Sequence, residues 1–148
     1  IMGSLTEYKG NDDSPGNKVY LRYADVLLWK AEALNESGNP EDAVTIINQI
    51  RERARTTPTA DGTTVSTGTL EARPSTNDQA QVRSWIQSER RVELGFESQR
   101  FNDLKRWGKA QTFLTGLGKN YQSHHILYPI PQSDIDKSGG SITQNPGY

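Results

Sequence analysis

Residues 20–54, YLRYADVLLWKAEALNESGNPEDAVTIINQIRERA, contain two apolar stripes separated by a turn. From Val19 to Ser37 the apolar residues recur at steps of three and four, which predicts a helix with one face toward a core. Asn39 and Pro40 then indicate the start of a second helix, which should end near Arg55. Because the connection is so short, the two helices should pack antiparallel. The stripe residues are Tyr20, Ala24, Leu27, Ala31 and Leu34 in the first helix and Ala43, Ile46, Ile47 and Ile50 in the second.

This hairpin matches part of the tetratricopeptide repeat, a helix pair whose small residues let the two helices approach closely. Lys30 stands where the repeat prefers leucine, and no clean second copy follows at a period of about 34 residues, which argues against a regular array. We therefore predict an all-α fold built on irregular tetratricopeptide-like hairpins. The matching positions are Ala31, Leu34, Gly38, Ala43 and Ile47.

Two segments outside the hairpin predict loops. Residues 1–17 are rich in Gly, Asn, Asp, Ser and Pro, and their acids lack the spacing of a calcium loop, so we favour a solvated turn over an ion site. Residues 56–78 are rich in Thr, Gly, Ser and Pro and have no helical stripe, with at most a short hairpin around DGTT. A loop this long is either functional or disordered.

Residues 79–108 are predicted to form charged helices, with Asp78 as the first cap and Gly95 at a break or a close helix contact. Residues 109–148 should form a loop-rich, extended tail containing one short helix. In that tail Ile126, Tyr128 and Ile130 alternate in a way that could bury one side. The apolar positions of the charged helices are Val82, Trp85, Ile86, Phe96, Phe101, Leu104 and Trp107.

Length and composition restrict the possible functions. A chain of 148 residues can hold one core, as a domain or as a piece of a larger one. With 17 basic and 18 acidic residues the net charge is −1, which gives no field to attract nucleic acid. The absence of cysteine excludes disulfides, thiolate zinc sites and cysteine nucleophiles. No apolar run approaches the roughly 18 residues that a membrane helix needs.

The stretch SERRVELGFESQRFNDLKRWG, residues 88–108, raises the question of a carboxylate site, because Glu89, Glu93 and Glu97 follow one another at intervals of four. A di-metal helix bundle would also need Glu-x-x-His from partner helices, and the only histidines, His124 and His125, lie in the proline-bearing tail. Spacings of three favour ion pairs between neighbouring acids and arginines instead. The expected pairs are Arg90 with Glu93, Glu97 with Arg100, and Asp103 with Arg100 and Arg106; Glu89 is included in the same structural set.

The sequence favours no catalytic chemistry. A glycosidase needs one carboxylic acid held protonated, whereas neighbouring arginines lower the pKa of a carboxyl group. There is also no Gly-x-Ser-x-Gly elbow and no glycine-rich phosphate loop. We therefore predict a protein that is not an enzyme and has no metal or cofactor. Trp29, Trp85 and Trp107 fall in helical patterns and are expected in the core.

Ligand-binding residues are harder to predict. Tyr121 and His124, together with His125, lie in polar loop sequence, so their rings are the candidates that a ligand such as a sugar could reach.

Four stretches taken in order resemble the C-terminal part of the SusD/RagB family of outer-membrane nutrient-binding lipoproteins. They are the hairpin at 20–54, the charged stretch at 88–108, YPIPQSDID at 128–136 and QNPGY at 144–148. The resemblance covers about residues 19–55 and 84–148 and implies that the charged helices are structural signatures. It also implies a cell-surface protein of Gram-negative bacteria that captures oligosaccharides or other nutrients with a SusC-like TonB-dependent porin.

The chain also departs from that family. Members are anchored through a lipidated N-terminal cysteine, which this sequence lacks, and they are much longer, so the chain resembles a C-terminal fragment of about a quarter to a third of a member. No motif here carries the family's ligand contacts over to particular residues. Two alternatives to a nutrient-binding protein remain open. The second hypothesis is a tetratricopeptide-like scaffold that binds a protein partner, and the third is a glycoside hydrolase.

Overall fold

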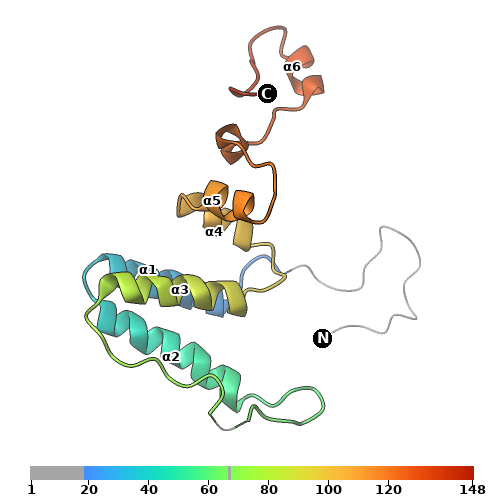
Figure 1. Cartoon of the computed structure of the whole chain (residues 1–148). Helices are drawn as coiled ribbons and strands as arrows, with labels where there is room; N and C mark the ends of the chain where they lie inside the picture. The colour runs from blue at the N-terminus through green and yellow to red at the C-terminus, as the bar shows by residue number, and fades with distance from the viewer. Residues whose placement is uncertain (1–18, 67) are drawn as a thin grey trace. The chain divides into compact units, whose positions relative to one another are not determined.

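The computed structural model describes residues 19–66 and 68–148, which divide into two compact units at the boundary between Glu97 and Ser98 (Figure 1). The predicted loop over residues 1–17 lies outside the described residues. No residue in the described ranges forms a β-strand, and the all-α prediction is confirmed. No helix in these ranges combines the length and apolar character needed to cross a membrane.

The first unit contains α1 (Tyr23–Glu36), α2 (Pro40–Thr56) and α3 (Gln79–Glu93). The helical hairpin is confirmed, and its second helix begins with Pro40 in the first turn, as predicted. Gly38, at a φ of 85°, reverses the chain between the helices in a conformation that residues with a Cβ rarely adopt. Asp78 caps α3, because its Oδ1 accepts a hydrogen bond of 3.0 Å from the Gln81 amide.

The core of this unit lies among the three helices. Ala31 packs with the α2 stripe and with Val82 and Ile86 of α3, while Leu28, Ile50 and Leu94 form a second buried cluster. Ala31 and Ala43 are fully buried, so their small side chains allow the close approach expected of such a hairpin. All four residues predicted for the apolar face of α2 are buried: Ala43, Ile46, Ile47 and Ile50.

Several burial predictions were wrong. The first helix starts at Tyr23 instead of Val19, so Tyr20 is outside the helical stripe and is exposed. Trp29 is 46% exposed, because α1 directs Leu28 and Ala31 to the core and Trp29 away from it. Phe96 is fully exposed, because α3 ends at Glu93 and the chain turns at a positive φ of 65°. The helical period therefore does not extend as far as Phe96.

The long loop before α3 is held in place by α2. The Asn48 side chain binds the backbone of Arg73 on both sides, accepting from its amide at 2.7 Å and donating to its carbonyl at 2.9 Å. Arg51 donates to the Glu71 carbonyl at 2.8 Å, and Arg55 to the Leu70 carbonyl at 2.6 Å. These bonds satisfy backbone groups that have no partner in a helix or strand.

DGTT lies in a tight turn and not in paired strands. The Thr59 amide donates to the Thr63 carbonyl at 2.8 Å. Asp61 accepts from the Thr63 amide at 3.0 Å and from the hydroxyl groups of Thr59 and Thr63. These bonds to the ionised carboxylate, foremost the one from Thr59, lower the pKa of Asp61 to about 2.

The second unit contains α4 (Arg100–Arg106), α5 (Ala110–Gly116), the 3₁₀ helix η2 (Ser123–Ile126) and α6 (Gln132–Lys137). Leu104, Ala110 and Tyr121 form its buried cluster, with Phe101, Phe113 and Leu114 packed against them. Trp85 and Trp107 are both half-buried. The prediction that one side of the tail is buried was wrong for Ile126 and Tyr128, which are both exposed.

Candidate functional site

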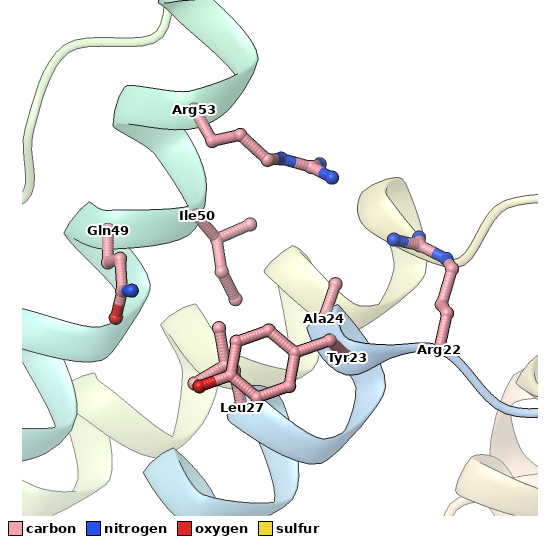
Figure 2. A pocket seen from close by; sticks show the side chains of 7 residues that line it. All are labelled: Arg22, Tyr23, Ala24, Leu27, Gln49, Ile50 and Arg53. Carbon is pink, nitrogen blue, oxygen red and sulfur yellow. The ribbon is translucent and has the colours of Figure 1, made fainter.

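A pocket of about 380 Å³ lies between the start of α1 and the second half of α2 (Figure 2). Ala24, Leu27 and Ile50 form its apolar floor. The Tyr23 ring stands beside this floor, and its side chain is 72% exposed. The volume lies in the range of small-molecule sites, and the combination of an apolar floor with a few polar groups is typical of such sites. The polar lining residues are Arg22, Gln49 and Arg53.

The helical hairpin positions these groups. Ala24 and Leu27 lie on the face of α1 that turns toward α2, and Ile50 lies on the facing side of α2. Tyr23 is the first residue of α1, one position before the buried Ala24, so its ring is at the edge of the helix pair. Gln49 likewise lies one position before a buried residue, Ile50, so its side chain is outside the buried stripe of α2 and is exposed. The pocket is therefore formed by residues that border the buried stripes.

Two glutamates fix Arg22 at the pocket. Its Nε donates to both carboxylate oxygens of Glu97 at 2.9 and 2.8 Å, and its Nη1 donates to Glu93 Oε1 at 2.7 Å. Its Nη2 also donates to the Glu93 carbonyl. These bonds, foremost those to Glu97, raise the pKa of Arg22 above its ordinary value. The guanidinium thus connects the residue before α1 to the end of α3 and remains charged.

Arg53 reaches the pocket from α2. Its Nη2 donates to Glu93 Oε1 at 2.5 Å, so Glu93 accepts from two arginines at once. The Arg53 side chain is 55% exposed, whereas that of Glu93 is only 11% exposed. Figure 2 shows the guanidinium groups of Arg53 and Arg22 extending toward one another above the floor. Arg53 is the more accessible cation of the two.

The charged residues singled out in the sequence pair mainly with other helices. Glu89 accepts from Arg51 of α2 at 2.9 Å, and Arg90 donates to Asp25 of α1 at 2.7 Å; these pairs are buried. Glu93 pairs with Arg22 and Arg53, and Glu97 also pairs with Arg22. The sequence had indicated Arg90 as the partner of Glu93 and Arg100 as that of Glu97. These partners come from other elements because the buried Arg90 reaches Asp25 of α1, while Glu93 at the end of α3 lies within reach of Arg22 and Arg53.

In the second unit the predicted Asp103–Arg106 pair is present at 2.9 Å, at the expected spacing of three positions. Arg100 lies against two aromatic rings, with its guanidinium carbon 4.9 Å from the Phe113 centroid and 6.0 Å from that of Trp107. Within the described ranges, no three His, Cys, Asp or Glu side chains come together as a metal-binding group.

The two predicted ligand residues belong to an aromatic cluster in the second unit. Tyr121 is buried, not free as its loop sequence suggested, because it packs edge-on against Phe101 and His125, with centroids 6.2 and 5.4 Å apart. The His124 ring lies 4.2 Å from that of His125 and 4.8 Å from that of Tyr148. Tyr121 lines a smaller pocket of about 180 Å³. A role in binding for Tyr121 or His124 stays a prediction.

Side chains of the C-terminal QNPGY stretch form hydrogen bonds with the backbone of residues 127–130, in and just before the YPIP stretch; we call this set of bonds the C-terminal clasp. Gln144 accepts from the Ile130 amide at 2.8 Å and donates to its carbonyl at 2.9 Å, so it binds both sides of one residue. Asn145 donates to the Tyr128 carbonyl at 2.7 Å, and the Tyr148 hydroxyl to the Leu127 carbonyl at 2.8 Å. Two stretches that looked separate in the sequence are thus one structural unit.

Sequence reasoning did not identify the larger pocket. Tyr23 and Gln49 break no periodic pattern, and Arg53 is one of several arginines near the end of α2. The available signal was that a tyrosine and two arginines border apolar stripes on helices predicted to be adjacent. That signal becomes specific only once the position of Glu93 is known, because Glu93 fixes both guanidinium groups.

The whole of residues 5–148 matches the model of the SusD family. SusD-like protein P38 of Formosa agariphila is 46% identical over 114 residues, covering 77% of this chain and 21% of the relative. SusD-like protein P2 of the same organism is 34% identical over 143 residues, covering 92% of this chain and 27% of the relative.

A similar fold is found in a solved structure. The crystal structure of a SusD-like protein from Bacteroides fragilis superimposes with a TM-score of 0.62 at 28% identity, covering 89% of this chain and 26% of that one. The chain spans about a fifth to a quarter of the length of these relatives. Its sequence and its helical architecture lead to the same conclusion: this chain belongs to the SusD family.

Proposed function

We propose that this chain is the C-terminal helical section of a nutrient-binding protein that captures oligosaccharides or related nutrients at the cell surface. The observation that carries the proposal is the pocket beside Tyr23. An accessible aromatic ring next to an apolar floor suits the C–H face of a sugar, and the amide of Gln49 and the guanidinium of Arg53 suit its hydroxyl groups. Family membership supports the same role.

The proposed role requires binding without chemistry. Glu89 and Glu93 of α3 accept hydrogen bonds from arginines of other elements, so both carboxylates take part in structural ion pairs. In a family of this kind the captured nutrient passes to a SusC-like TonB-dependent porin in the outer membrane, and we propose that partner here. The lipid anchor at the cell surface is likewise a proposal from the family.

The test is a glycan-binding screen of the full-length protein that carries this chain, run beside the 148-residue chain alone. Binding by both, abolished or weakened in both by Tyr23→Ala, is the expected result. The matched control is Trp29→Ala, because Trp29 is an exposed aromatic residue on the same helix but does not line the pocket.

Two results would contradict the proposal in different ways. Binding by the full-length protein alone, unaffected by Tyr23→Ala, would place the nutrient site outside these residues. Failure of the full-length protein both to bind any glycan and to capture a TonB-dependent porin would refute nutrient uptake as its function.

A further inference from the structure

The charged side chains that line the pocket beside Tyr23 have one sign. Among the residues that the structure describes, they are Arg22 and Arg53, and no carboxylate lines the pocket. Glu93 and Glu97 hold the arginines but do not line the pocket, so the cationic ends of these ion pairs face the space that a ligand would occupy. Such an arrangement favours an anionic group over a neutral one.

The two arginines differ in what they can still bind. Arg22 uses Nε, Nη1 and Nη2 for Glu97 and Glu93, and its side chain is 26% exposed. Arg53 donates from Nη2 to Glu93 and is 55% exposed, so the rest of its five-donor fork is accessible at the rim. A planar guanidinium with two accessible N–H groups suits a carboxylate, which accepts two parallel hydrogen bonds.

The other wall of the pocket is suited to a ring. The exposed face of Tyr23 adjoins the floor formed by Leu27 and Ile50, and the Gln49 amide lies across the pocket on α2 (Figure 2). A pyranose ring has an apolar C–H face and a rim of hydroxyl groups. Figure 2 shows Gln49 and Arg53 on opposite sides of Ile50, so a ring placed against Tyr23 would have one edge toward Gln49 and another toward Arg53. The site therefore combines an aromatic surface for a sugar ring with a guanidinium that can donate hydrogen bonds to an anion.

We propose that this pocket binds a pyranose that carries a carboxylate, a uronic acid residue, with the ring on Tyr23 and the carboxylate on Arg53. The inference rests on the proposed function and deepens it by naming the chemical class of the sugar. Gln49 completes the site as a donor and acceptor for a ring hydroxyl. Arg22, whose Nε, Nη1 and Nη2 all donate to Glu93 or Glu97, connects the start of α1 to the end of α3.

The experiment is an NMR titration of the full 148-residue chain with methyl β-D-glucuronide and, separately, with methyl β-D-glucoside. The two probes share a ring and differ in the carboxylate. At low salt the glucuronide should bind roughly fivefold more tightly, which is the size of effect of an accessible ion pair. Because such a pair is screened, this preference should largely disappear at about 1 M salt, where the screening length is about 3 Å.

Paired variants assign the two parts of the site. Arg53→Gln keeps N–H donors but removes the charge, so it should make the two probes bind equally. Tyr23→Ala should weaken both probes together. Arg83→Gln and Trp29→Ala are the controls: Arg83 is an exposed arginine paired with Glu36, Trp29 is an exposed aromatic residue, and neither lines the pocket. Both controls should leave binding unchanged, and melting curves should show that all four variants are folded.

Equal affinity for the two probes, or a preference that survives Arg53→Gln, would overturn the inference. So would the absence of binding to either probe at millimolar concentrations. If the full-length protein still binds glycans in the screen described above, such a result removes the uronic acid site and leaves the nutrient-binding function standing. If the full-length protein binds no glycan, the function itself fails.

Discussion

Removal of Asp25 should destabilise the protein severely, because it removes a carboxylate that binds the buried Arg90 guanidinium. Asp25 and Arg90 are 1% and 2% exposed, and Arg90 Nη1 lies 2.7 Å from Asp25 Oδ1. Loss of one partner from a buried pair costs about 3–5 kcal/mol, because the remaining charge stays desolvated and loses that favourable interaction. In Asp25→Ala the free energy of unfolding should therefore fall by about that amount.

The matched control is Glu36→Ala. Its partner Arg83 is bound at 2.6 Å, but the two side chains are 44% and 41% exposed, so solvent already screens them. We expect a loss of about 0–1 kcal/mol in this variant. Both pairs join α1 to α3, which leaves burial as the main difference between them.

Urea unfolding followed by circular dichroism measures both changes, and thermal melting offers a second readout. A loss of 3–5 kcal/mol should lower the melting temperature by more than about 10 °C in a unit of this size. The double variant Asp25→Leu, Arg90→Met should recover most of the loss, because an apolar pair of similar volume has no charge to desolvate. Equal, small effects of Asp25→Ala and Glu36→Ala would refute the claim that burial determines the cost.

Three further predictions concern local structure. Asn48→Ala should free the loop backbone at Arg73, so limited proteolysis between residues 57 and 78 should become faster while cleavage elsewhere is unchanged. An unchanged rate in the loop would mean that the other loop contacts are enough to hold it against α2. Gly147→Ala should loosen the C-terminal clasp, because a Cβ there would lie 2.6 Å from His124 Cβ at a φ of 96°, and faster amide exchange at the tail is the measurement. Asp61 should titrate by NMR with a midpoint at about 2, below its usual 3.8, so its stabilisation of the turn is present above pH 3.8 and is lost as the pH falls through about 2. A midpoint near 3.8 would contradict the bonds from the threonine hydroxyl groups.

The sequence was most informative where structure is local. The start of α2 at Pro40 and the burial of Ile46, Ile47 and Ile50 follow from the proline in the first turn and from the helical period, although Asn39 makes no side-chain capping bond. The helix ends at Thr56, one residue beyond the predicted end near Arg55. These signals depend on residues within a few positions of one another, so they can be read without knowledge of the rest of the chain. The family resemblance was carried by the same ordered stretches.

The sequence was least informative about which side chains meet. Trp29 fits a helical pattern but is exposed, and Tyr121 lies in polar sequence but is buried, because burial depends on which neighbouring elements cover a residue. Ion pairing could be predicted only in part for a related reason. The spacing of three gives the Asp103–Arg106 pair, but it does not indicate the pairs that Glu89 and Glu93 form with arginines of other elements.

The helical hairpin, the Asp78 cap, the long loop and the charged character of α3 could all be predicted from the sequence. The contact between Arg90 and Asp25, 65 positions apart, and the bonds from Arg22 and Arg53 to Glu93 at the edge of a pocket emerge only from the packing of the helices. Helix formation depends on contacts between near neighbours, whereas pockets and buried ion pairs depend on how separate helices approach one another. Many sequences with the same stripes can form this hairpin, but the position of α3 against it fixes the pocket beside Tyr23.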